Sequence, residues 1–251
     1  MDVTSSSLSS CAIAVMAKTP RPGSSKTRLC PPLRPDQAAQ LSEGFHRDMF
    51  GNIARAAWQA PIAGYAAYAP AGTKAAMKAL MPRGMGLVLA DGTPPMPKDV
   101  WGFGRCLLHA IEGLFALGHP AACVLNSDSP TLPTACLVRA AQILMESGDR
   151  VVLGPAEDGG YYLLGMREVH AALFADIAWS TDTVAQSTRH RAAELGLEVV
   201  ELPVWYDVDD AASLLRLMLE IGAGAPGAYP APATQDALRR FGLAALRAAA
   251  E

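Results

Sequence analysis

The sequence has few aromatic residues and no long apolar run. Aromatic residues make up 6% of the chain, and no stretch approaches the roughly 20 consecutive apolar residues that a membrane helix needs. Residues 1–10 contain no Lys or Arg and no apolar core, so we expect a disordered arm there and no secretory signal. The five cysteines include no Cys-x-x-Cys pair, which argues against a zinc site or a disulfide framework and favours reduced thiols in a cytoplasmic protein.

Several common functional motifs are absent as well. No Gly-x-Gly-x-x-Gly dinucleotide fingerprint follows the first apolar run, no Gly-x-Ser-x-Gly hydrolase elbow occurs, and no glycine directly precedes Lys26, as a Walker A loop requires. The chain also lacks a basic surplus, because 21 Lys and Arg residues against 24 Asp and Glu residues give a net charge of −3. This balance argues against a general nucleic-acid binder, which would normally be basic.

The chain does contain enough apolar residues, 51% of 251 positions, to bury one sizeable core. Apolar runs alternate with helical patterns, which predicts an α/β fold with a mostly parallel central sheet flanked by helices. We expect one domain over residues 11–221, followed by a linker and a C-terminal helix within 222–251. Strands are expected at 11–17, 62–69, 86–90, 121–125, 151–153, 161–166 and 197–202, and helices at 37–58, 73–81, 100–117, 134–146, from after 180 to 195, 211–221 and 235–249.

Polar clusters follow several of the expected strands, which is where ligands bind in open α/β sheets. The first cluster is a loop with five cationic and no acidic side chains between Lys18 and Arg34. Amides of a glycine-containing loop can cradle a polyphosphate while Lys and Arg bind its oxygens, although such a pattern is also typical of a solvated basic loop. The candidate nucleotide-binding residues are Lys18, Pro22, Gly23, Ser24, Lys26 and Arg28.

Acidic residues follow two other expected strands. Asp128 comes shortly after the buried run 121–125, where a carboxylate would suit Mg²⁺, which takes one or two protein carboxylates and completes its shell with phosphate and water. The same position is also typical of a residue that only caps a turn. Asp207 and Asp209, two positions apart, point to the same side of the chain if their segment is extended, so one of them is a candidate second metal ligand. Asp210 is expected to cap the following helix.

Two further segments are candidates for acceptor binding. The Glu-Asp-Gly-Gly-Tyr run at 157–161 places two acids beside aromatic rings, as a small acceptor site would, but it is also typical of a plain hairpin turn. The Ser-Thr-Asp run at 180–182 could bind substrate or cap a helix. The candidate acceptor-binding residues are Glu157, Asp158, Gly159, Gly160, Tyr161, Ser180, Thr181 and Asp182.

Taken in this order, the clusters resemble a known family over about residues 11 to 221. The matching stretches are AKTPRPG at 17–23, KTRL at 26–29, SDSP at 127–130, LGPAEDGGYYLLG at 153–165, WSTDTV at 179–184 and DVD at 207–209. They resemble the bacterial GT-A-fold nucleotide-diphospho-sugar transferases (DUF2064-like) that often occur beside radical-SAM and selenodomain proteins. More distantly they resemble the phospholactate guanylyltransferases and the molybdenum-cofactor nucleotidyltransferases. The family's Gln-Gly and Leu-Gly-x-Arg segment is reduced here to Trp101–Arg105, with Asp91 and Gly92 where Gln-Gly would stand.

The resemblance implies a Rossmann-like GT-A fold, with a nucleotide held by the first loop and Mg²⁺ or Mn²⁺ held by Asp128 together with Asp207 or Asp209. It implies a transferase in which Lys26, Arg28 and Asp128 are catalytic. The strongly basic loop favours a nucleotidyltransferase that moves NMP from an NTP to a small phosphate- or phosphonate-bearing acceptor and releases pyrophosphate. The alternatives are a glycosyltransferase with a nucleotide-diphospho-sugar donor and a non-catalytic nucleotide-binding protein. We expect no nucleic-acid or membrane partner, and a homodimer stays open.

Overall fold

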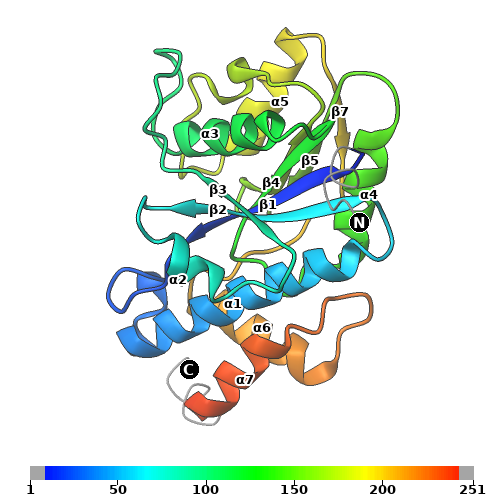
Figure 1. Ribbon diagram of the computed structural model, residues 1–251. Coiled ribbons are helices and arrows are strands. Elements are labelled where there is room, and N and C mark those ends of the chain that lie inside the picture. Colours follow the sequence, from blue (N-terminus) through cyan, green and yellow to red (C-terminus); the bar gives the residue numbers. More distant parts are fainter. Residues whose placement is uncertain (1–8, 243–251) are drawn as a thin grey trace.

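The first strand of the chain lies at the centre of the sheet. β1 (Cys11–Lys18) is buried on both faces and pairs in parallel with β2 (Ile62–Ala69) on one side and β4 (Ala121–Leu125) on the other. Its uninterrupted apolar sequence suits a strand that is covered on both faces. The computed structural model describes residues 9–242, and its sheet has seven strands in the order β3-β2-β1-β4-β6-β5-β7 (Figure 1).

One strand of this sheet runs against its neighbours. β6 is antiparallel to both β4 and β5 because β5 and β6 are consecutive strands of a hairpin, whereas all other pairings are parallel. The predicted α/β class with a mostly parallel sheet is therefore confirmed. The remaining strands are β3 (Gly86–Leu89), β5 (Arg150–Pro155), β6 (Tyr161–Met166) and β7 (Glu198–Glu201).

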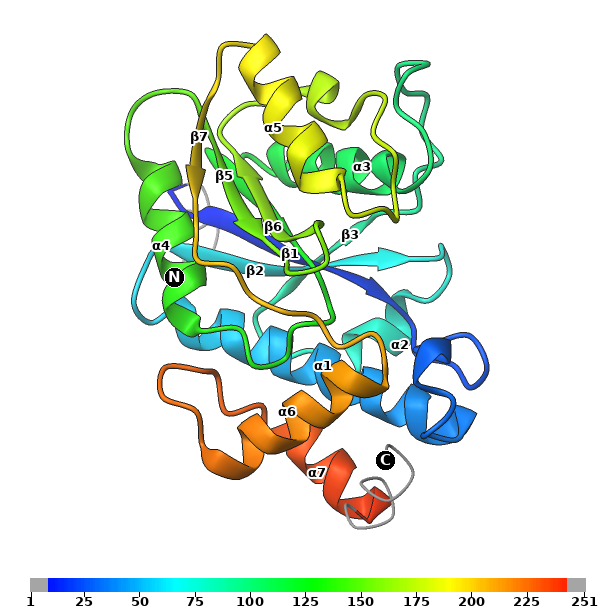
Figure 2. The same ribbon diagram turned by 180° about the vertical axis from the view of Figure 1, so that it is seen from behind.

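Helices cover both faces of the sheet (Figures 1 and 2). α1 and α4 pack on one face against Ile13 and Val15, while α3 and α5 pack on the other face against Ala12 and Ala14. Alternating β1 side chains therefore enter two separate cores, as the two-residue period of a strand requires. The helices are α1 (Pro35–Ala56), α2 (Lys74–Lys78), α3 (Phe103–Ala116), α4 (Thr134–Met145), α5 (Val184–Glu194), α6 (Ala211–Ala223) and α7 (Pro232–Phe241).

Most predicted bounds differ from the observed ones by a few residues. The largest error concerns the C-terminal helix, which was expected at 235–249 but begins at Pro232 and ends at Phe241, before Gly242. The helix expected from just after residue 180 begins at Val184. Two short 3₁₀ helices, η1 (Thr27–Leu29) and η2 (Ala171–Phe174), were not predicted. The arm expected at 1–10 lies outside the described residues up to position 8, as does the last part of the expected C-terminal helix.

No helix within residues 9–242 combines the length and the apolar character that crossing a bilayer demands.

A third apolar cluster joins the last two helices to the outer side of α1. Leu41 and Phe45 of α1 pack with Leu214 and Leu217 of α6 and with Leu238 of α7. Figure 1 shows α6 and α7 beneath α1, on the side away from the sheet. The C-terminal segment of the described chain is thus packed against the helix that carries part of the candidate site.

A buried carboxylate fixes the start of α7. Asp48, on α1, is 1% exposed and accepts hydrogen bonds from the backbone N–H groups of Ala233 at 3.0 Å and Thr234 at 2.7 Å. These amides belong to the first turn of α7, where backbone donors have no partner within the helix. A side chain 185 residues earlier in the sequence therefore supplies the cap.

Replacing Asp48 by alanine should lower the free energy of unfolding by about 1 to 3 kcal/mol, because two amides would stay buried without an acceptor. Urea denaturation followed by circular dichroism measures this loss. The matched control, Glu43→Ala, removes an exposed ion pair with Arg47 on the same helix and should cost no more than about 0.5 kcal/mol. Equal losses in the two variants would contradict the capping role.

Candidate functional site

The loop after β1 is held by its own hydrogen bonds. The N–H groups of Ser24 and Ser25 both donate to the carbonyl oxygen of Arg21, at 3.2 and 3.1 Å, and Ser25 Oγ accepts from the Arg21 N–H. Gly23 has φ +77°, which the tight turn requires. The amides of Ser24 and Ser25 are therefore paired within the loop itself. Pro22 and Gly23 are exposed and line no cavity described below.

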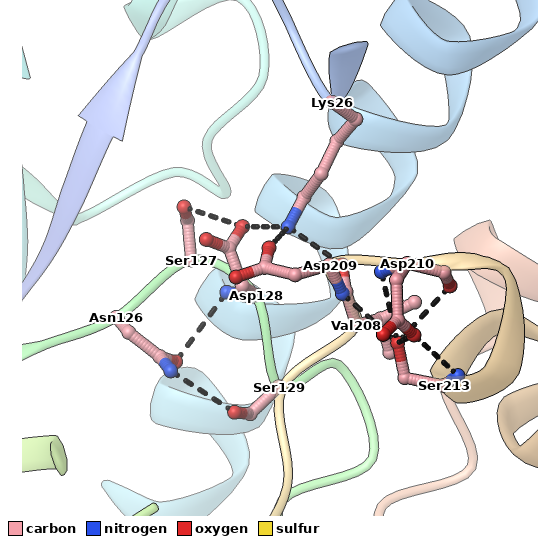
Figure 3. Close-up of polar contacts among 9 residues, drawn as sticks. All are labelled: Lys26, Asn126, Ser127, Asp128, Ser129, Val208, Asp209, Asp210 and Ser213. Atoms are coloured by element: carbon pink, nitrogen blue, oxygen red, sulfur yellow. Dashed lines mark hydrogen bonds and ion pairs between the residues drawn. The ribbon is translucent and has the colours of Figure 1, made fainter. Parts of the chain in front are cut away.

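Lys26 turns back from this loop into the protein (Figure 3). Its φ of +50° and ψ of +43° place it in the left-handed region at the start of η1. The Lys26 Nζ lies 2.8 Å from Asp128 Oδ1 and 2.8 Å from Asp209 Oδ1, and it also donates to the carbonyl oxygen of Val208 at 2.8 Å. The side chain is only 7% exposed, and Nζ lies 5.4 Å from the centre of the Phe45 ring.

Lys26 and Asp128 stabilise each other's charged form. Burial by itself would lower the pKa of Lys26, but the Asp128 and Asp209 carboxylates outweigh burial and raise that pKa. Burial would likewise raise the pKa of Asp128, yet the Lys26 ammonium and the Ser127 hydroxyl lower it. Both shifts favour the charged form, so the ion pair persists through neutral pH.

The backbone around both carboxylates is fixed by local hydrogen bonds (Figure 3). Asn126 accepts from the Asp128 N–H at 3.3 Å, and the Val208 N–H donates to the Asp128 carbonyl oxygen at 2.9 Å. Ser213 Oγ accepts from the Asp209 N–H at 3.0 Å. The Asp128 carboxylate therefore faces Lys26 rather than only capping its own turn.

Asp210 has the role that the sequence predicted for it. Its carboxylate accepts from the Ser213 N–H at 2.8 Å and so caps α6. This cap fixes the direction in which α6 leaves the segment that carries Asp207 and Asp209.

A cavity of about 370 Å³ opens beside the ion pair. The first loop contributes Lys18, Ser24, Lys26 and Arg28 to its lining, and the two carboxylates at 128 and 209 also border it. The remaining walls come from small or apolar side chains at the strand ends and from the start of α3; they include Met16, Ala67, Ala69, Ala90 and Phe103. One space therefore combines cationic groups with an apolar surface.

A second hollow of about 480 Å³ lies next to the cavity. Arg28 and Asp209 line both spaces, whereas Asp207 lines only the second hollow. Burial raises the pKa of Asp207 to about 7, with further contributions from the charges of Asp158 and Asp209. Of the two acids that the sequence left as alternatives, Asp209 shares the Lys26 ammonium with Asp128, whereas Asp207 is near enough to Asp128 for that charge to contribute to its raised pKa.

The predicted acceptor segments lie side by side, but only part of them borders the second hollow. Gly159 has φ +86°, and a Cβ atom there would lie 2.0 Å from the carbonyl oxygen of Asp182, so only glycine fits this contact. Glu157 and Asp158 line the hollow, where Glu157 pairs with Arg216 at 2.6 Å.

The other proposed acceptor residues line neither space. Gly160 donates its N–H to the Asp158 carboxylate at 2.8 Å, a bond within the turn that is typical of a plain hairpin. Tyr161 packs into the core on the α3 side, because strand alternation in β6 directs it inward. The exposed side chains at 180–182 also stay outside both spaces.

Sequence reasoning missed His46, which also lines the first cavity. His46 is 2% exposed, and neither ring nitrogen has a hydrogen-bond partner among the described residues. Burial lowers its pKa to about 4, with Asp128 opposing and Lys26 adding to the shift. A signal was present in the sequence, because Ser42 and His46 stand four residues apart in the expected helix and are therefore neighbours on its surface.

Comparisons with known proteins agree with this architecture. The profile of a family described as "Uncharacterized protein conserved in bacteria (DUF2064)" matches residues 52–181, and no curated protein matches the sequence. A "putative nucleotide-diphospho-sugar transferase" from Desulfovibrio desulfuricans G20 superposes with a TM-score of 0.79 at 29% identity, over 95% of this chain and 97% of that chain. A CMP:2-keto-3-deoxy-manno-octonic acid synthetase complexed with CTP superposes with a TM-score of 0.50 at 12% identity, over 86% and 99% of the two chains. The fold of nucleotide-diphospho-sugar transferases is therefore confirmed.

His46 should make the fold sensitive to acid. A histidine whose pKa is lower in the folded than in the unfolded state costs stability as the pH falls below its unfolded value of about 6.5. Between pH 7 and pH 5 this group should remove about 2 kcal/mol from the free energy of unfolding. Urea denaturation at both pH values should show a smaller loss of unfolding free energy in His46→Phe than in wild type. The exposed His190, changed to Phe, is the control, and an equal pH effect in wild type and His46→Phe would refute the assignment.

Proposed function

We propose that the chain is a metal-dependent nucleotidyltransferase. The premise is that it belongs to the bacterial DUF2064 family. Its fold is that of nucleotide-diphospho-sugar transferases. The proposed reaction moves NMP from an NTP to a small acceptor that bears a phosphate or phosphonate, with release of pyrophosphate.

The observation that carries this proposal is the Asp128–Lys26–Asp209 group in the wall of a cavity that holds further cations. Within residues 9–242, neither the Lys18 nor the Arg28 side chain forms an ion pair, although both border the same cavity. Cationic groups without protein partners favour a polyanionic ligand such as a triphosphate, which guanidinium binds through paired oxygens. A volume of about 370 Å³ falls within the roughly 300–1,000 Å³ of small-molecule sites.

The apolar side of the cavity supports a nucleotide rather than a bare phosphate. Ala67, Ala69 and Ala90 are small, so a flat ring can approach the strand ends closely. Phe103 lies at the same cavity and contacts Trp179 edge to face, with ring centres 5.9 Å apart. Base–aromatic stacking is a recurring form of nucleotide binding. We therefore assign this side to the nucleobase.

The donor set fits a hard divalent cation. Asp128 and Asp209 each direct one oxygen to the point that Lys26 Nζ now occupies, and Mg²⁺ or Mn²⁺ prefers such oxygen ligands. No group of three or more His, Cys, Asp or Glu side chains in the described part of the chain is placed to hold a metal, so phosphate oxygens and water would complete the shell. Bound there, the ion would neutralise negative charge on the reacting phosphates.

The second hollow suits the acceptor, because Arg28 and Asp209 border both spaces. An acceptor oxygen placed there would form a bond to the α-phosphorus of the NTP. The bond from that phosphorus to the bridging oxygen would break, and its electron pair would leave with pyrophosphate. Arg28, which forms no ion pair within residues 9–242, would bind the phosphate oxygens through this step.

Glycosyl transfer is the second candidate, and one observation favours it. The structure that superposes with a TM-score of 0.79 is named for nucleotide-diphospho-sugar transfer. The same cavity would then hold the nucleoside diphosphate as a leaving group, and the sugar would extend toward the second hollow.

The released product separates the two reactions. Incubation with each NTP, Mg²⁺ and a panel of phosphorylated and phosphonylated acids should release pyrophosphate, and EDTA should abolish the release. Enzymatic detection of pyrophosphate measures the first reaction, and chromatography of UDP or GDP released from nucleotide sugars measures the second. Nucleoside diphosphate without pyrophosphate would replace the proposal by glycosyl transfer.

Replacing Asp128 by asparagine should lower turnover by about 100-fold or more, because the carboxylate that faces both Lys26 and the phosphates is lost. Circular dichroism should show a retained fold. Asp149→Asn, which changes a carboxylate that pairs with His170, is the matched control and should leave turnover unchanged. A folded Asp128→Asn variant with unchanged turnover would contradict the catalytic role.

A further inference from the structure

All hydrogen-bonding capacity of the Lys26 ammonium is used inside the protein. An ammonium has three N–H donors, and Nζ has three oxygen neighbours at 2.8 Å: Asp128 Oδ1, Asp209 Oδ1 and the Val208 carbonyl oxygen. Although Lys26 borders the cavity, none of its donors is free for a ligand there. Lys26 in this arrangement serves the protein's own carboxylates and not a phosphate.

The same group is not neutral. Within residues 9–242, Lys26 is the partner of each carboxylate in an ion pair, so one positive charge faces two negative charges. A divalent cation at this point would balance the two carboxylates completely. The ammonium would then be available to an anion in the cavity.

We propose that Lys26 is the resident counter-ion of Asp128 and Asp209, and that it turns to the nucleotide phosphates only when a divalent cation takes its place. This inference rests on the proposed function, since it concerns how nucleotide and metal enter that same site. Its consequence is that the two ligands bind cooperatively rather than independently.

The energetics require this coupling. A divalent cation alone would have to displace an ammonium that makes three hydrogen bonds, into a cavity without an anion. A nucleotide alone would draw Lys26 away and leave two carboxylates without a cation, which is costly in a partly buried position. When both arrive, each exposed charge finds a partner. By linkage, each ligand must then raise the affinity for the other by the same factor.

Lys26 can make this exchange by rotating its side chain. It already lines the cavity together with Lys18 and Arg28, so the phosphate site lies beside its present position. The four-carbon stem of lysine is flexible, and its ammonium can rotate among oxygen partners. In its present position the ammonium also makes a cation–π contact with the Phe45 ring, whose centre lies 5.4 Å from Nζ.

Binding of Mn²⁺ alone, followed by the electron paramagnetic resonance signal of the free ion, tests the proposal without nucleotide or turnover. Wild type should bind Mn²⁺ weakly, and Lys26→Met should bind it at least about tenfold more tightly, because no ammonium competes for the carboxylates. Lys18→Met removes the same charge from the same cavity without touching Asp128 or Asp209, and should change the affinity by less than about threefold.

Two further variants locate the effect. Lys26→Gln retains an amide donor for the carboxylates and should also bind Mn²⁺ more tightly than wild type, which keeps the test valid if Lys26→Met folds poorly. Adding Asp128→Asn to either variant should remove the gain, since one of the two metal ligands is then lost.

The outcomes separate this inference from the proposed function. Equal Mn²⁺ affinity in wild type and both Lys26 variants would overturn the counter-ion role, even if NTP-dependent pyrophosphate release is observed. A tenfold gain in Mn²⁺ affinity in the Lys26 variants, together with no pyrophosphate release by the wild type, would instead support the counter-ion role and contradict nucleotidyl transfer. A gain of the same size in Lys18→Met would show a general charge effect and also overturn the inference.

Discussion

A single buried ammonium connects three segments that are far apart in the sequence. Lys26 comes from the loop after β1, Asp128 from the turn after β4, and Val208 and Asp209 from the segment before α6, and all three segments meet at Lys26 Nζ. Removing one member of a buried charge pair leaves the other uncompensated, which costs far more than the pair contributes. The geometry of the cavity and of the second hollow therefore depends on the Lys26 ammonium and its two carboxylate partners.

The backbone prepares the positions of these charges. The segment after β7 passes the carboxyl end of β5 and the amino end of β6 before it reaches α6 (Figure 2). It is fixed along the way, because the Leu202 N–H donates to Leu153, the Glu157 N–H donates to Trp205, and the Val208 N–H donates to Asp128. Main-chain hydrogen bonds consequently bring Asp209 to the turn after β4, where its carboxylate meets Lys26.

Arg28 and Asp209 give the site its directional character. They lie on the boundary between a cavity with cations and apolar walls and a hollow that is rich in acids. A phosphate chain at this boundary would be bound by guanidinium on one side and would face carboxylates on the other. Such an arrangement supports the proposed transfer between two ligands over the alternative of a non-catalytic nucleotide-binding protein.

The sequence by itself determined the fold class and which loops are polar. The apolar run of β1, the alternation of strands with helices and the position of polar clusters after strands follow from local periodicity and turn chemistry, and the strands at 62–69, 121–125 and 161–166 match their predicted bounds. Local patterns also gave the capping role of Asp210, because a cap bonds within one turn of chain.

Only the tertiary structure decided which charges meet. The spacing of Asp207 and Asp209 leaves open which of them meets Lys26, and main-chain hydrogen bonds between remote segments place Asp209 there. The predictions for Tyr161 and His46 failed for the same reason. β6 directs Tyr161, a predicted acceptor residue, into a core, while the packing of α1 directs His46, which was not predicted, to the cavity. Contacts between residues about a hundred positions apart depend on how strands are ordered in the sheet, and no local pattern in the chain encodes that order.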